Sequence, residues 1–171
     1  MSQSGLVSNV QIPRRKIKIS HFDNSALIAG YSKTLIGRCM NPQRQDMKTL
    51  LFMLPRIWQL EGKVVGADLG LGRFQFDFET EEDIVDVLKM EPLHFDHWMV
   101  SLVRWRPSID PAYPSSLTFW IRVLGVPIQY WAETTFNDIG AALGEVKAVD
   151  VDGGRVQVEL NGFMPLCFDT E

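Results

Sequence analysis

Two stretches of the chain repeat one another at a fixed distance, and this repeat most constrains the fold. Residues 62–78 read GKVVGADLGLGRFQFDF and residues 144–160 read GEVKAVDVDGGRVQVEL, which align without a gap at an offset of 82 residues. Six positions are identical, and apolar residues alternate with polar ones at the end of both stretches. Such alternation is typical of a half-buried strand, and glycines between two strands indicate a hairpin. The repeat therefore predicts two copies of one strand–turn–strand unit.

The residues around the first copy predict a mixture of helices and strands. A short strand at 35–40 precedes an amphipathic helix, for which Asn41 is the expected cap and which Pro55 is expected to end or kink near Leu54. After the hairpin, Thr80 is expected to cap a second helix with an acidic first turn, and 97–105 is expected to form the next strand. This order predicts an α+β fold, a ferredoxin-like β-α-β-β-α-β arrangement followed by a second, partial β-α-β-β unit.

Composition and pattern divide the chain into four parts. Three prolines between the two units favour a surface loop there, and basic residues dominate the start of the chain. The expected parts are a basic flexible arm and lead-in at 1–34, an α+β unit at 35–105, a proline-rich loop at 106–116, and a second β-α-β-β unit packed on the first at 117–171.

Basic and acidic side chains are distributed unevenly. Residues 1–40 carry six Lys or Arg and one Asp, while residues 41–171 carry eleven basic and twenty acidic side chains. Because Lys and Arg supply most of the affinity for phosphate backbones, we expect weak, sequence-independent binding of RNA or single-stranded DNA through the arm. The side chains predicted to make these contacts are Arg14, Arg15, Lys16 and Lys18, with Arg38, Arg73 and Arg155 as helpers.

The stretch GRFQFDF, residues 72–78, has two interpretations. Its three phenylalanines share one strand face, and Gln75 and Asp77 share the other. Aromatic residues on a strand can stack on RNA bases, but the predicted helices also need an apolar face on which to pack. Valines and a leucine hold the same positions in the second copy. The pattern therefore favours an aromatic core face over a base-stacking surface.

No catalytic or metal site is expected. Two cysteines and three histidines show no metal-ligand spacing, and no nucleophile–base motif is present. We therefore expect no enzymatic activity, no metal, no cofactor and no small-molecule substrate. No apolar run approaches the ~18 residues of a membrane span, and no signal peptide opens the chain. The sequence thus favours an intracellular location, nuclear or cytoplasmic, without a membrane partner.

Four tryptophans near the boundary between the two units have two interpretations. Trp98, Trp105, Trp120 and Trp131 either cement the two units together or form a partner-binding surface, because tryptophan is enriched at interfaces. Together with the acidic body, the second interpretation gives an alternative function. The chain would then be a protein–protein or self-association module without nucleic-acid affinity.

The order of several motifs resembles a known family. These motifs are LIGR, LEGKVVGADLGLGRFQFDFE, EEDIVDVLKMEPLHFDHWMVSLVRWRP, FWIRVLGVPIQYW, IGAALGEVKAVD and RVQVEL, which span about three-quarters of the chain from residue 35 to residue 166. The chain is similar to the plant domain of unknown function in LINE-type non-LTR retrotransposon proteins. The resemblance implies an RRM-like fold and nucleic-acid binding, commonly followed by a CCHC zinc knuckle. The knuckle's cysteines are absent here, so zinc binding is not expected.

Overall fold

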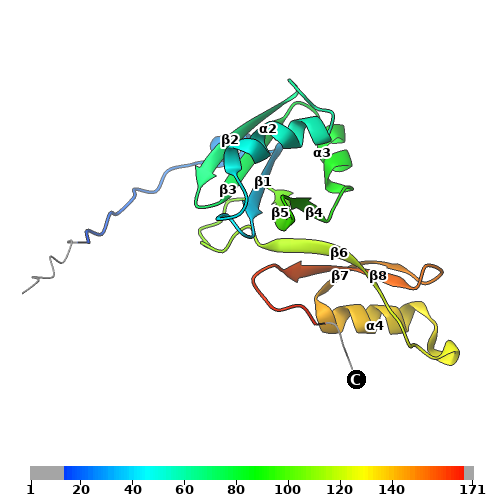
Figure 1. The fold of residues 1–171 in the computed structure, drawn as a ribbon. Coiled ribbons are helices and arrows are strands. Elements are labelled where there is room, and N and C mark those ends of the chain that lie inside the picture. Colours follow the sequence, from blue (N-terminus) through cyan, green and yellow to red (C-terminus); the bar gives the residue numbers. More distant parts are fainter. Residues whose placement is uncertain (1–13, 168–171) are drawn as a thin grey trace, which may run out of the picture.

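The structure, a computed structural model, describes residues 14–167, so the first thirteen residues of the predicted arm lie outside the described residues. The secondary structure falls into two successive units (Figure 1). The first contains α1 (Ser25–Ala29), β1 (Thr34–Cys39), α2 (Met47–Ile57), β2 (Val64–Gly70), β3 (Arg73–Phe78), α3 (Glu81–Leu88), β4 (Leu93–Phe95) and β5 (Trp98–Arg104). The second contains β6 (Ser116–Arg122), a 3-10 helix (Ile128–Tyr130), α4 (Glu133–Leu143), β7 (Glu145–Asp150) and β8 (Arg155–Asn161). Among the described residues, no helix is long and apolar enough to cross a membrane.

The first unit has the strand order of a ferredoxin-like domain. Its five-stranded antiparallel sheet has the order β2-β3-β1-β5-β4, which places β1 and β3 side by side. This confirms the predicted α+β fold and its β-α-β-β-α-β order. Strand β4 was not predicted because three residues are too few to show alternation. It joins β5 through Asp96 and His97, which both have positive φ, as a type I′ hairpin turn requires.

The second unit repeats the first half of the first unit. The order β6-β8-β7 has the same connectivity as β1-β3-β2, with α4 in the place of α2, so the sequence repeat extends to the fold. The two hairpins nevertheless differ. Gly70 pairs with Arg73 across a two-residue turn, whereas Asp150 pairs with Arg155 across a four-residue loop. The gapless alignment therefore matches β3 to β8 correctly. In the preceding strands, β2 and β7, it matches residues that have different cross-strand partners.

The phenylalanines of β3 form the centre of the core. Phe74 and Phe76 are fully buried and Phe78 is 6% exposed. The ring of Trp58, at the end of α2, meets the Phe76 ring edge-on at 5.1 Å between centroids. Burial of each phenylalanine contributes roughly 1.5–3 kcal/mol. The interpretation of GRFQFDF as a core face is confirmed, and these three rings cannot stack on bases.

The helix boundaries follow local capping chemistry. Helix α2 begins after Asp46, whose carboxylate accepts a hydrogen bond from the Thr49 backbone N–H at 2.8 Å, so the expectation of a start at Asn41 was wrong. Pro55 lies inside the helix, which continues to Ile57. A proline that close to the end of a helix disturbs only its last turn, so the helix does not end at Leu54.

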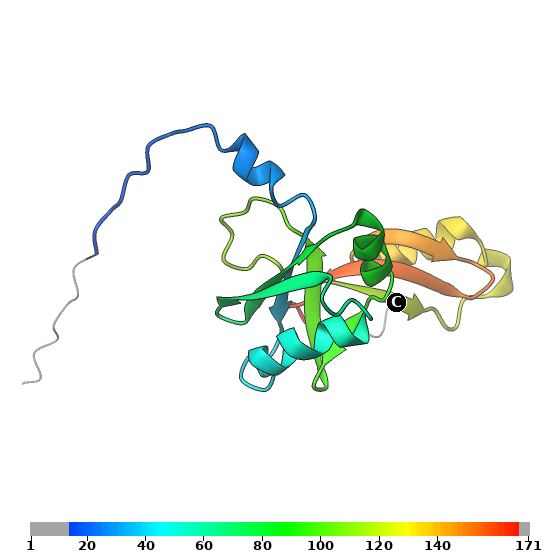
Figure 2. The same cartoon turned by 90° about the horizontal axis from the view of Figure 1, so that it is seen from above.

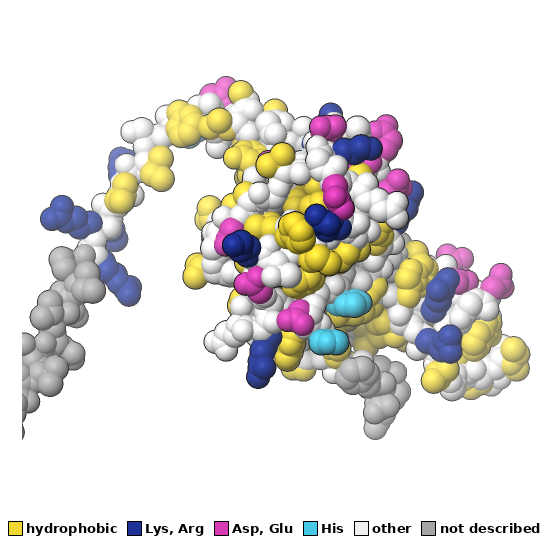
Figure 3. Space-filling model, turned by 45° about the horizontal axis from the view of Figure 1, so that its top comes forward, with side chains coloured by type: hydrophobic (Ala, Val, Ile, Leu, Met, Phe, Trp, Pro, Cys, Tyr) yellow, Lys and Arg dark blue, Asp and Glu magenta, His cyan; other side chains and the backbone are white. Residues whose placement is uncertain are grey.

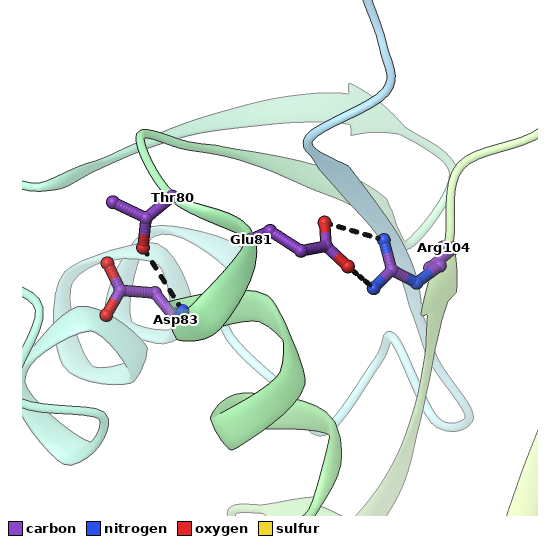
Figure 4. A network of polar contacts seen from close by, with 4 residues as sticks. All are labelled: Thr80, Glu81, Asp83 and Arg104. Atoms are coloured by element: carbon purple, nitrogen blue, oxygen red, sulfur yellow. Dashed lines mark hydrogen bonds and ion pairs between the residues drawn. The ribbon is translucent and has the colours of Figure 1, made fainter.

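Helix α3 begins as predicted. The Thr80 hydroxyl accepts a hydrogen bond from the Asp83 backbone N–H at 3.2 Å (Figure 4). In the next position, Glu81 forms a bidentate ion pair with Arg104, at the end of β5 (Figure 4). Arg104 lowers the pKa of the Glu81 carboxyl through this hydrogen-bonded contact. The pair fixes the start of α3 to the edge of the sheet.

Candidate nucleic-acid interface

The described part of the arm is extended and fully accessible. Residues 14–24 have no regular secondary structure, and Arg14, Arg15, Lys16 and Lys18 are all exposed. Figures 1 and 2 show this segment running away from both units. In Figure 3, its extended part carries only basic charged side chains, whereas basic and acidic side chains are mixed over the body. The arm therefore presents four cations within five residues, with no fixed geometry.

The outer face of the first sheet, opposite its helices, is covered at β1 and β5. Ile36 and Ser101 point to this face, yet Ile36 is 6% exposed and Ser101 is fully buried. The cover is the proline-rich loop, residues 106–116, which Figure 2 shows on the other side of the sheet from α2. Pro114 of the loop is also buried, and the Ser101 hydroxyl donates to the Ser116 backbone oxygen at 2.7 Å. A base cannot reach these outward positions of β1 and β5 while the loop is in place.

Arg38 holds this loop. Its guanidinium donates to the backbone oxygens of Pro111, Tyr113 and Pro114 at 2.6, 3.1 and 2.9 Å. Burial lowers the pKa of Arg38, and the neighbouring charge of Arg73 lowers it further. The predicted nucleic-acid contact of Arg38 is therefore replaced by a structural one, because the nitrogens that would bind phosphate already bind the chain.

Arg73 lies directly opposite Arg38 on the adjacent strand. Its Nε is buried and, among the described residues, has no hydrogen-bond partner. Like charges directly opposite one another on a sheet destabilise it. The three loop carbonyls offset this repulsion for Arg38, whereas Arg73 remains only half-buried, at the edge of the covered area.

Arg155 lies apart from these two, on β8 of the second unit. It is exposed, forms an ion pair with Asp150 at 2.7 Å, and lies over the Trp120 ring at 4.6 Å from its centroid. Directly opposite on β6 is Arg122, also exposed. Each unit thus carries a cross-strand arginine pair between its first and third strands. Neither a role for Arg122 nor the exposure of Trp120 was predicted, although the alternation in SLTFWIR places both on one face.

The tryptophans do not gather between the two units. Trp105 stacks on Tyr31 with 4.4 Å between ring centroids, and Trp131 packs edge-on against Phe136 within the second unit. Trp98 and Trp120 are 44% and 39% exposed. The expectation that tryptophans cement the two units was therefore wrong, because Arg38 and Ser101 make the connecting hydrogen bonds instead.

The described titratable side chains of the body provide no candidate metal site. Among residues 14–167, no group of three or more His, Cys, Asp or Glu is placed to hold a metal ion. Burial, and to a lesser extent the charge of Asp68, raises the pKa of the Cys39 thiol to about 11. At neutral pH this thiol is protonated and therefore a poor nucleophile.

Together these features define an α+β domain with an exposed basic arm and a covered sheet face. Residues 29–113 match the family model described as "Domain of unknown function (DUF4283)", so this part of the chain is similar to that family. A second match is an uncharacterized protein of Arabidopsis thaliana, At4g02000, with 29% identity over 68 residues. The match covers 40% of this chain and 22% of that protein, so the chain corresponds to a minor part of its plant relative.

Two solved structures resemble the chain, both with a low TM-score and a low sequence identity. One is described as a Sxl-lethal protein/RNA complex, with a TM-score of 0.37, 16% identity, and coverage of 76% of this chain and 82% of that chain. The other contains the N-terminal three RNA binding domains of the yeast splicing factor Prp24, with a TM-score of 0.30, 12% identity, and coverage of 76% and 54%. The fold assignment rests on the strand order of the first unit.

Proposed function

We propose that this chain is a non-enzymatic, retrotransposon-derived module that binds RNA or single-stranded DNA through its basic arm. The observation that carries the proposal is the accessibility of Arg14, Arg15, Lys16 and Lys18 on an extended segment outside an acidic body. Cations on such a segment can follow a phosphate backbone without a fixed register. Binding is therefore weak, salt-sensitive and largely independent of base sequence.

The test replaces the four arm cations by glutamine in the full chain and measures binding of a fluorescein-labelled oligouridylate across a salt titration. Each phosphate contact on a single strand contributes about 0.7 to the slope of log K against log salt, so the slope should fall by about 3. A matched control compares Lys16→Gln/Lys18→Gln with Lys48→Gln/Lys63→Gln, because Lys48 and Lys63 are exposed on the body. An unchanged slope in the fourfold variant, or equal losses in both pairs, contradicts the proposal.

A second candidate function, self-association, is supported by an apolar loop in the second unit. Between β6 and α4, Leu124 is 80% exposed, Ile128 85% and Tyr130 58%. Exposed large apolar residues this close together are typical of protein–protein contacts. Sedimentation velocity should then show a concentration-dependent dimer that Ile128→Ser abolishes. A monomer at all concentrations excludes this function.

A further inference from the structure

The outer face of the second sheet differs from that of the first because its arginine pair is uncovered. Val156 and Val158 of β8 are fully buried, and a Cβ on Gly140 of α4 would touch both, so α4 covers the inner face. Alternation places Trp120, Arg122, Arg155 and Gln157 on the other face, where Trp120 pairs with Gln157 and Arg122 with Arg155. In Figure 1, the hairpin end of this sheet projects away from the first unit.

The arginine pair lacks the partners that its counterpart in the first unit has. Arg38 is bound by three loop carbonyls, whereas Arg155 has a single carboxylate partner, Asp150. The guanidinium of Arg122 has no hydrogen-bond or ion-pair partner within residues 14–167. Two arginines directly opposite one another repel, so an anion that contacts both would relieve the repulsion. The charge at this end of the sheet is therefore complementary to phosphate.

Two further carboxylates on the strands of this face, Glu145 and Glu159, are already engaged. Glu159 lies two residues beyond Gln157 on β8 and pairs with Lys147 at 3.1 Å. Lys147 also pairs with Glu145 at 2.9 Å. Gln157 lies between these three charged side chains and the arginine pair, so they do not neutralise the arginines.

An aromatic ring lies beside the arginine pair. Trp120 is 39% exposed, and the Arg155 guanidinium already stacks on its ring. Indole faces stack on bases of any sequence, and a neighbouring arginine strengthens such contacts through cation–π attraction. Gln157, directly opposite Trp120, adds an amide donor and acceptor at the edge of the same surface.

We propose that Trp120, Arg122, Arg155 and Gln157 form a nucleotide-binding surface for single-stranded nucleic acid. Arg122 and Arg155 bind one phosphate, and the adjoining base stacks on Trp120. This inference rests on the proposed nucleic-acid function but concerns a different site, which adds a base contact to the phosphate contacts of the arm.

The test uses the full chain with Trp120→Leu, Trp120→Phe and Arg122→Gln. Trp120→Leu should weaken oligouridylate binding at least about fivefold, and Trp120→Phe should retain most of the affinity, because stacking of one base contributes at least that much. Arg122→Gln should lower the salt slope by about 0.7. Arg44→Gln, at an exposed arginine of the first unit, is the matched control and should change neither.

Inorganic polyphosphate as a second probe separates the two contacts. Its binding should fall in Arg122→Gln and stay unchanged in Trp120→Leu, because it has phosphates and no bases. Equal effects of Trp120→Leu on both probes contradict base stacking. Arg122→Gln removes no side-chain hydrogen bond or ion pair within the described residues, so it remains informative if Trp120→Leu fails to fold.

The outcomes also separate this surface from the arm. Normal oligouridylate binding by both Trp120→Leu and Arg122→Gln overturns the surface and leaves the arm proposal intact. An unchanged salt slope after neutralising the arm overturns the arm proposal and leaves the surface intact. If Trp120→Leu alters sedimentation without altering oligouridylate binding, the surface is a protein contact and the inference is wrong.

Discussion

At the scale of single residues, two positions require glycine because neighbouring atoms leave no room for a Cβ, and not because of their backbone angles. Gly37, in the middle of β1, lies under the Phe74 ring, and a Cβ there would be much closer to the ring atoms than van der Waals contact allows. Gly144, at the end of α4, has φ of 177°, which any residue can adopt, but a Cβ would meet the Glu159 backbone oxygen. The core of each unit therefore relies on a missing side chain as much as on the apolar ones present.

Gly37→Ala should destabilise the protein even though alanine suits a strand better than glycine. The added methyl must displace the fully buried Phe74 ring, and overpacking of this kind costs about 1–3 kcal/mol. Urea denaturation of the single variants and of Gly37→Ala/Phe74→Leu would measure the coupling. Leucine removes the ring, so alanine should cost less in that background. A neutral Gly37→Ala variant would show that the ring can move freely.

At the scale of elements, most of the fold could be predicted because periodicity and capping are local. Alternation located β3 and β8, and Thr80 with its acidic successors located α3. Three features were not predicted correctly, each for a physical reason. Asp46 caps α2 in place of Asn41, and Pro55 fits into the last turn of that helix. Strand β4 is too short to show the alternation of apolar and polar residues.

Only part of the candidate interface could be predicted, because local sequence patterns do not encode contacts between distant residues. The local run of Lys and Arg was enough to locate the arm, because a segment of this composition is normally exposed. Whether Arg38 is available depends on a loop more than seventy residues away, and no local pattern encodes that contact. Trp120 and Arg122 carried a readable alternation in SLTFWIR, but only the pairing of β6 with β8 places Arg155 beside them.

At the scale of the whole molecule, the proline-rich loop links the two units and closes the outer face of the first. Arg38 binds three of its carbonyls, and the guanidinium also lies 5.6 Å from the centroid of the Phe163 ring, which follows β8. The Tyr113 hydroxyl donates to the Arg104 backbone oxygen at 2.9 Å and anchors the loop to the end of β5. One arginine of β1 thus contacts both the connecting loop and the C-terminal end of the second unit.

Arg38→Ala should release the loop while leaving the core of the first unit folded. Hydrogen bonds from a charged donor contribute about 1.5–3 kcal/mol, so the variant should lose about 2 kcal/mol of unfolding free energy. Amide hydrogen exchange should accelerate across residues 106–116 and stay slow in β1 and β3. Arg38→Lys should restore only part of the protection, because an ammonium cannot span three carbonyls as a planar guanidinium does. Arg44→Ala, at an exposed site, is the control, and unchanged exchange in Arg38→Ala would mean that the buried Pro114 holds the loop without the arginine.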